Sequence, residues 1–347
     1  MRWYLFSLVT CCLCLVAFAP IPVASRLVGG IDLSALCEKA ELVVVGRVDG
    51  VREDGFATVI VSGMSYPAKR MVAQLAIEKV LKGQPSGGVL NLSFGLPTVR
   101  VMDMSPPPAV AGQYQVFFLR RQGEGYQVVD PDYPSVVANP GSPPTYGSVL
   151  DQVIAEVCYV LASPRATPDD KQKALGVLRG VPSPIVMTAL KTATRDPVPD
   201  VRLSAMALLL HRNDISELVT AENILLHPPS DIDQNALDGL AFAIRFGVHD
   251  PKAIPSLTRL MAAKNVNVRI GAATALRRTH DGAAIKPLTQ GLYDSDPDVL
   301  YQAVIGLAEL TYTRGEWAPG EGLFLKDQKR YLDYWREWAR SQKQMPE

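Results

Sequence analysis

Asp294-Ser-Asp-Pro-Asp-Val299, followed by Ala303 and Leu307, carries a pattern that recurs through the second half of the chain. Two clear copies are Asp196–Val201 with Ala205 and Leu209, and Asn265–Val268 with Ala272 and Leu276. Two weaker copies are Asp170 with Ala174 and Leu178, and Ile232 with Ala236 and Leu240. The register positions 170, 201, 232, 268 and 299 are separated by steps of 31, 31, 36 and 31 residues. Steps of this size predict a solenoid of stacked helix pairs.

Each copy carries the signals of a turn that starts a helix. Asp296 is placed to cap free backbone amides, and Pro297 suits the first helical turn, where its missing amide donor costs nothing. Val299, Ala303 and Leu307 then lie on one face of the helix, at spacings of four residues. The small alanine in each copy favours a close approach between neighbouring helices.

This pattern resembles HEAT repeats, especially the short bacterial repeats that align with phycobilin lyases. The resemblance covers about half of the chain. Arg202 and Arg269 occupy the family's usual Val-Arg position, and Leu300 replaces the arginine in the last copy. The resemblance implies that this arginine bonds to the Asp turn of the neighbouring repeat, with a partner-binding role as the alternative.

Runs of β-branched and alternating apolar residues in the first part of the chain predict β-strands. They lie at residues 41–48, 56–61, 72–80, 88–94, 114–119 and 126–129. Short strands separated by Gly, Pro and Asp are typical of a small all-β barrel or sandwich. The runs Cys37–Val48, Val80–Gly83 and Gly112–Leu119 are similar to the netrin-like, or TIMP-like, module, which implies an OB-like barrel. Inhibitory members of that family chelate the zinc of the protease with an N-terminal Cys-x-Cys. Here position 35 is Ala, so the resemblance does not imply metalloproteinase inhibition.

Proline and glycine mark the boundary between the two halves. We place a signal peptide at 1–25, a β domain at 31–140, a Pro/Gly linker at 141–148 and a helical domain at 149–347. The prolines predict an extended, stiff linker that isolates the halves. The helical domain ends in Tyr331, Trp335 and Trp338, which share one helical face. Large aromatic side chains suit the cap of a solenoid, and a ligand-binding platform is the alternative.

The N-terminus predicts export. Arg2 precedes an almost wholly apolar run to Ala19, followed by small residues that suit signal-peptidase cleavage. An uncleaved anchor and a lipoprotein attached through Cys11, Cys12 or Cys14 are the alternatives. Cleavage would leave Cys37 and Cys158, which form either one disulfide or two separately buried thiols.

Catalytic and ligand-binding motifs are not apparent in the sequence. His211, His227, His249 and His280 are scattered, and none forms the His-Glu pair on which some HEAT-like enzymes carry iron. We therefore expect neither metal nor cofactor. The formal net charge of zero, with charged residues at 20%, gives no electrostatic reason to expect nucleic acid.

The sequence thus predicts a secreted or envelope-associated scaffold, of bacterial type, that binds a protein partner through its solenoid and is not an enzyme. Two alternatives remain open. One is an enzyme inhibitor acting through the netrin-like domain, and the other is a HEAT-like lyase acting on a chromophore protein.

Overall fold

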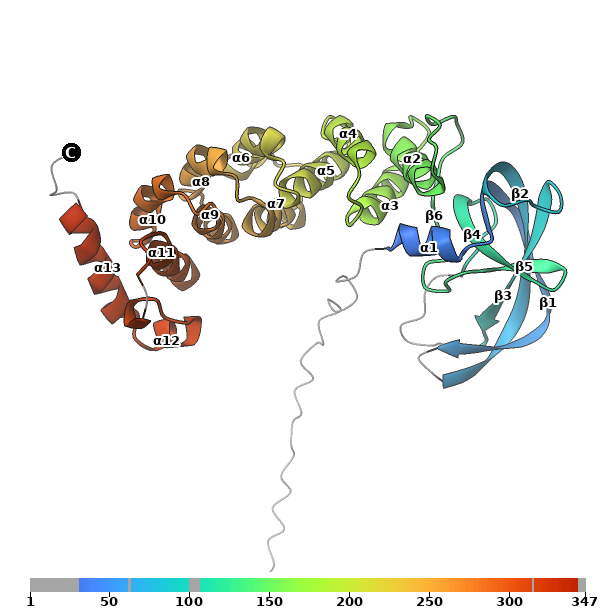
Figure 1. The fold of residues 1–347 in the computed structure, drawn as a ribbon, viewed down its shortest axis with the longest axis horizontal. Coiled ribbons are helices and arrows are strands. Elements are labelled where there is room, and N and C mark those ends of the chain that lie inside the picture. The colour runs from blue at the N-terminus through green and yellow to red at the C-terminus, as the bar shows by residue number, and fades with distance from the viewer. Residues whose placement is uncertain (1–30, 62–63, 100–106, 314, 343–347) are drawn as a thin grey trace, which may run out of the picture. The chain divides into compact units, whose positions relative to one another are not determined.

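A computed structural model describes residues 31–61, 64–99, 107–313 and 315–342. The predicted export signal, with Cys11, Cys12 and Cys14, lies outside these residues. The described chain begins with a short helix and six strands and continues as helices to its end (Figure 1). This order confirms the predicted fold class, an all-β region followed by a helical solenoid.

The β region is a single sheet whose strands close into a barrel-like ring. Helix α1 (Leu33–Lys39) precedes β1 (Leu42–Val61), β2 (Met64–Lys82), β3 (Val89–Pro97), β4 (Tyr114–Gln122), β5 (Gly125–Val128) and β6 (Ser135–Val137). The strand order is β1-β2-β3-β5-β4-β6, and β1 also pairs with β4, which closes the ring. The expected strands 41–48 and 56–61 are one strand, because Asp49-Gly50 forms an irregularity in the ladder to β2 instead of a turn.

The helices α2 to α11 form two rows in Figure 1. The even row contains α2 (Val149–Ala162), α4 (Pro184–Ala193), α6 (Leu218–Leu226), α8 (Ile254–Leu260) and α10 (Ile285–Gly291). The odd row contains α3 (Pro168–Leu178), α5 (Pro199–His211), α7 (Gln234–Gly247), α9 (Val266–Arg278) and α11 (Pro297–Leu310). Within the odd row each helix packs on the next, and each helix from α5 onward also packs on the even-row helix that precedes it.

The start of α11 follows the sequence prediction in detail. Asp296 is its N-cap and accepts hydrogen bonds from the amides of Asp298 and Val299, and Pro297 is the first helical residue. The buried positions Val299, Ala303 and Leu307 face the core. Local turn chemistry therefore determines where this helix begins.

The structure corrects one repeat register. Ile232 precedes α7, whose cap is Asp233, so it cannot be the equivalent of Val201 inside α5. In α3, α5, α9 and α11 the register residue lies three positions after the N-cap, so Ala236 takes this place in α7. The buried Leu240 and Ile244 are then the equivalents of Ala205 and Leu209. The register positions are therefore 170, 201, 236, 268 and 299, and the longest step, 35 residues, falls before α7. The extra residues extend the loop between α6 and α7.

A shared core joins the β region to the first helices. One cluster of buried residues combines Val43 and Phe118 of the sheet with Cys37 of α1 and with Ile154 and Val157 of α2. It continues into α3, α4 and α5. The expectation that the 141–148 linker isolates the two halves is therefore wrong, since apolar burial is continuous across the boundary.

Glycine brings the odd-row helices close together. A Cβ atom built on Gly247 of α7 would lie 2.2 Å from the carbonyl oxygen of Leu210 in α5. One built on Gly271 of α9 would lie 2.8 Å from the carbonyl oxygen of Ala241 in α7. Gly306 of α11 faces the aliphatic part of Arg277 in the same way. The close approach expected of alanine is thus achieved by glycine at these contacts.

Candidate functional site

The most prominent exposed feature of the odd row is an aromatic pair on α7. Phe242 and Phe246 are one helical turn apart and remain 57% and 42% exposed, although the opposite side of α7 is buried. Their ring centroids are 4.5 Å apart, and the guanidinium of Arg245 lies 5.1 Å from the Phe246 ring. Single exposed apolar side chains are ordinary, but adjoining ones beside an arginine are typical of interaction sites.

Arginines occupy the C-terminal ends of helices in the same row. Arg212, at the end of α5, donates to the carbonyl oxygens of Leu178 and Arg179 at the end of α3, at 2.6 and 2.8 Å. Arg278, the last residue of α9, donates to the Arg245 carbonyl of α7 at 3.1 Å. Helix ends leave carbonyl groups without intrahelical donors, and these guanidinium groups supply them.

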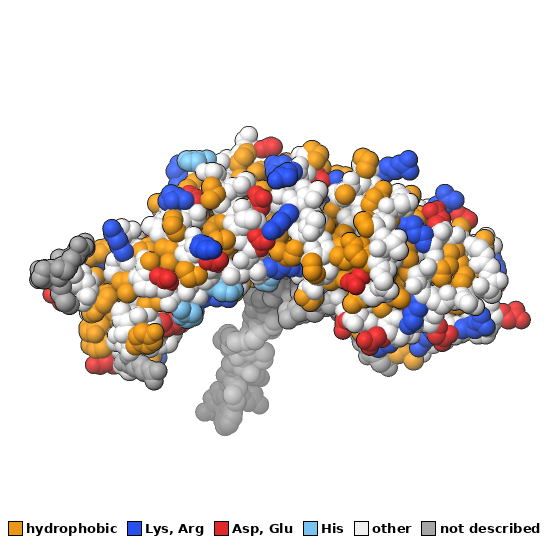
Figure 2. All heavy atoms as spheres, turned by 45° about the horizontal axis from the view of Figure 1, so that its top comes forward, with side chains coloured by type: hydrophobic (Ala, Val, Ile, Leu, Met, Phe, Trp, Pro, Cys, Tyr) orange, Lys and Arg blue, Asp and Glu red, His pale blue; other side chains and the backbone are white. Residues whose placement is uncertain are grey.

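The arginines create a locally positive environment around His211, an exposed residue at the end of α5. Burial of the ring lowers the pKa of His211, and the charges of Arg179, Arg212 and Arg278 lower it further. These charges therefore converge on one place, although they come from three different helices. By contrast, Figure 2 shows a face on which hydrophobic side chains are interspersed with charges of both signs.

Arg202 and Arg269 lie at equivalent positions but differ in their contacts. The guanidinium of Arg269 makes two hydrogen bonds, 2.8 and 3.0 Å, to the carboxylate of Asp294 in the next repeat. Arg202 donates to the carbonyl oxygen of Asp196 in its own turn at 3.0 Å. Both side chains therefore serve the turns between repeats.

Two other repeats contact the following repeat through different residues. Lys171 replaces the arginine in α3 and pairs with Asp196 at 2.6 Å. In α7 the equivalent position is Leu237, and the next residue, Asp238, accepts hydrogen bonds from the side-chain amides of Asn265 and Asn267. Side chains of α3, α7 and α9 therefore contact the turn or helix start of the next repeat, whereas Arg202 of α5 bonds within its own turn.

Trp335 and Trp338 lie in the final helix, α13 (Gln328–Gln342), which follows α12 (Glu321–Lys326). Trp335 is fully buried, and its indole nitrogen donates to the carbonyl oxygen of Trp317 at 3.0 Å. Trp338 is partly buried and packs edge-on against Trp335. Because α13 packs on α10 and α11, these side chains cover the end of the solenoid core and Trp335 offers no surface to a partner.

Cys37 and Cys158 are both buried free thiols in the cluster that joins α1, the sheet and α2. Burial raises the pKa of Cys37 to about 11 and that of Cys158 to about 12. A thiol is reactive as the thiolate, so neither residue has the character of a nucleophile or a metal ligand at neutral pH.

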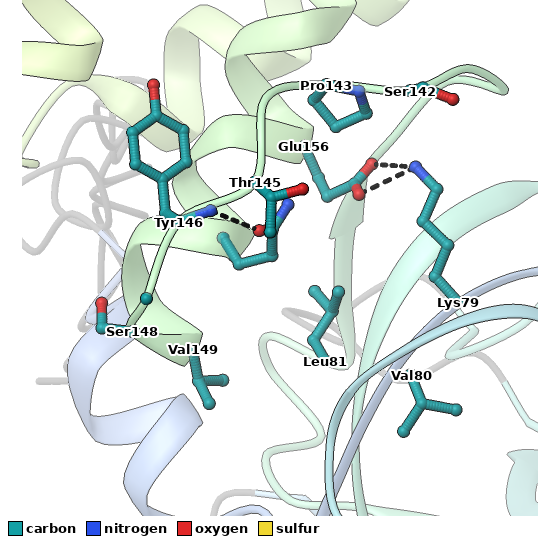
Figure 3. Close-up of a pocket in the computed structure, with 12 residues that line it drawn as sticks. Lys79, Val80, Leu81, Ser142, Pro143, Thr145, Tyr146, Ser148, Val149 and Glu156 are labelled. Carbon is teal, nitrogen blue, oxygen red and sulfur yellow. Dashed lines mark hydrogen bonds and ion pairs between the residues drawn. The ribbon is translucent and has the colours of Figure 1, made fainter.

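A cavity of about 450 Å³ lies where β2, the linker and α2 meet (Figure 3). Glu156, which is 0% exposed, receives two hydrogen bonds from the ammonium of Lys79, at 2.8 and 3.0 Å. Burial raises the pKa of Glu156, and the Lys79 charge opposes that shift. Gln152 accepts a hydrogen bond from the Tyr146 amide at 2.9 Å. This pair was not predicted from the sequence, although a glutamate inside the apolar run of α2 was a signal.

The histidines do not assemble into a site. His249 sits near the end of α7 with its Nδ1 2.8 Å from the Gly247 carbonyl oxygen. Within the described ranges, three or more His, Cys, Asp or Glu side chains are nowhere grouped to hold a metal ion. No helix among the described residues combines the length and apolar character that a membrane crossing requires.

Comparison with known proteins bears on the helical half. Residues 218–308 match the family model for HEAT repeats, so the C-terminal half contains HEAT repeats, as its sequence pattern predicted. No curated protein matches the chain. Among solved structures, human deoxyhypusine hydroxylase in complex with glycerol aligns with 55% of this chain and 73% of that chain, at 16% identity and a TM-score of 0.25. A similarity this low carries no argument about activity.

Proposed function

We propose that this chain is an exported, non-enzymatic scaffold whose HEAT repeats bind a protein partner across the odd row. The observation that supports it most is the exposed Phe242–Phe246 pair beside Arg245. Aromatic and arginine side chains contribute most of the binding energy at protein interfaces, particularly where they cluster.

The odd row also provides a rigid platform for such a partner. Gly247 and Gly271 allow α5, α7 and α9 to pack closely, and the Arg269–Asp294 contact connects α9 to the turn before α11. A preorganised surface loses little conformational entropy on binding, so more of the contact energy appears as affinity. The site lies on helices rather than loops, which further favours a fixed geometry.

Export is the second part of the proposal and depends on the apolar run after Arg2. Cell fractionation followed by N-terminal sequencing tests it, because cleavage near Ala19 or Ser25 supports export. Recovery of the intact chain in the cytoplasm contradicts it.

Capture of the partner tests the first part. The tagged full chain is compared with Phe242→Ala/Phe246→Ala, in cells that naturally produce it, after mild cross-linking. The control is Leu323→Ala/Leu325→Ala, because these α12 side chains are 59% and 48% exposed and lie outside the odd row. We expect one protein to be lost with the Phe variant and kept with the control. Equal recovery with both variants would refute binding at this face.

A further inference from the structure

Four arginines lie toward the ends of successive helices of the odd row, and one of them, Arg245, lies against the ring of Phe246. We define the arginine strip as Arg179, Arg212, Arg245 and Arg278, which lie toward the C-terminal ends of α3, α5, α7 and α9. Among the described residues, none of these four guanidinium groups forms an ion pair with a carboxylate. The Nε atom of Arg245 is buried and has no hydrogen-bond partner there. Buried donors without partners are uncommon in folded proteins.

The carboxylates that follow these helix ends are occupied elsewhere. Asp214, Asp250 and Asp281 each cap the next turn by accepting a hydrogen bond from a backbone amide. Asp214 also pairs with Lys191 at 2.9 Å. Glu309 approaches Arg277, the neighbour of the strip on α9, at 3.5 Å.

Helix capping explains only part of the arginine strip. Arg212 and Arg278 bond to main-chain carbonyls of the preceding helix in the row, which is a structural role. Within the described chain, the side chains of Arg179 and Arg245 donate no hydrogen bond to such a carbonyl group, so capping does not account for them. Arg245 instead lies against the ring of Phe246, which places a positive charge directly beside the exposed apolar pair.

We propose that the arginine strip and the Phe242–Phe246 pair together bind an acidic peptide segment that carries one apolar anchor side chain. This rests on the proposed function and specifies the partner's chemistry. Carboxylates match guanidinium groups in shape and charge, and the anchor would remove the two rings from water. Complementary charge fixes the register and speeds association, while the aromatic contact supplies affinity.

A protein ligand fits this surface better than a nucleic acid. The chain has a formal net charge of zero, whereas nucleic-acid binding depends on many phosphate contacts and an overall basic face. The exposed apolar pair is also suited to an aliphatic or aromatic side chain. Binding of an oligonucleotide is therefore an outcome that the experiment must distinguish.

Fluorescence anisotropy with the purified full chain tests the inference. The probe is a fluorescein-labelled peptide rich in Asp and Glu with one central Trp. Comparison probes replace every Asp and Glu by Asn and Gln, replace the Trp by Gly, or are a single-stranded DNA of equal charge. Protein variants are Phe242→Ala/Phe246→Ala and Arg179→Glu/Arg245→Gln. The matched control is Lys264→Glu/Lys326→Glu, at exposed lysines outside the strip.

We expect the acidic Trp peptide to bind more tightly than the other probes, and less tightly as salt increases. Each of the two variants should weaken binding by about tenfold, whereas the lysine control should not. Equal binding of the neutral peptide, or of the DNA, would overturn the inference. In the capture experiment, a partner lost with the Phe variant but kept with Arg179→Glu/Arg245→Gln would leave the proposed function standing and refute the acidic ligand.

Discussion

Replacing Gly247 by alanine should separate α5 from α7 and weaken the solenoid. The added Cβ atom would lie 2.2 Å from the Leu210 carbonyl oxygen and 2.3 Å from the His211 Cα atom. Both contacts are with backbone, so no side-chain rotation relieves them. Because non-bonded carbon atoms are most stable about 3.5–4.0 Å apart, the helices must move apart by roughly 1 Å or more.

The loss of folding free energy caused by Gly247→Ala follows from this overlap. Overpacking a close-packed core costs about 1–3 kcal/mol, and a backbone overlap belongs at the upper end. Alanine regains at most about 1 kcal/mol relative to glycine in a helix. The expected net loss of stability is therefore about 2 kcal/mol.

Gly239→Ala is the matched control, since it lies in the same helix and its added Cβ would meet no atom within 4 Å. It should stabilise the protein by about 0.5–1 kcal/mol through helix propensity alone. Urea unfolding gives the sign of both changes, and hydrogen exchange locates them. Loss of protection should concentrate in α5, α7 and α9. A Gly247→Ala protein as stable as Gly239→Ala would refute the close packing of the row.

Three further features can be tested: the Arg269–Asp294 contact between repeats, the buried Glu156 and the two buried thiols. Burial acts to raise the pKa of Asp294, but hydrogen bonds from Arg269 and the backbone outweigh it and lower that pKa. The Arg269–Asp294 contact should therefore stabilise the fold at neutral pH and be lost as pH falls through the lowered pKa. Arg269→Leu should cost about 1.5–3 kcal/mol in urea unfolding at pH 7 and flatten the acid dependence. Burial raises the pKa of Glu156, so its contribution to stability is present at low pH and is lost as pH rises through the raised pKa. Glu156→Gln should remove that dependence, as read from unfolding midpoints across pH, and an unchanged profile would contradict the argument. Cys37 and Cys158 should resist iodoacetamide at pH 8 in the folded protein and react after unfolding, as mass spectrometry would show; labelling of the folded chain would contradict their burial.

The features that could be predicted from the sequence are those encoded locally. The turn at Asp296 and Pro297 specifies its own cap and first helical residue, so the start of α11 was predictable. The alternation of the strands likewise indicated a β region. The resemblance to HEAT repeats rested on several such turns and was confirmed by the family match.

The errors arose where one local signal allows two structures. Ile232 and Ala236 lie on the same apolar four-residue spacing, and only the Asp233 cap of α7 shows that its register begins at Ala236. Asp49-Gly50 is as suitable for a strand irregularity as for a turn. Proline in the linker predicted stiffness, but it could not reveal that Ile154 would pack with the sheet.

The candidate site was not predicted because the sequence alone does not show which side of α7 is exposed to solvent. Apolar residues occupy more of that helix than one buried face requires, and this surplus was the available signal. The arginine strip joins residues from four helices, so it exists only after the repeats stack. Lys79 and Glu156 are likewise 77 positions apart and meet only through the shared core.

Site-directed photo-cross-linking can show whether a protein partner binds at the Phe242–Phe246 pair. A benzoylphenylalanine placed at Phe242, in cells that naturally produce the protein, reports whatever contacts the odd row. We predict one discrete protein adduct from position 242 and none from position 323 on α12. Adducts from position 323 alone, or no adduct from 242 under conditions in which the chain is folded, would contradict a partner-binding role for this face.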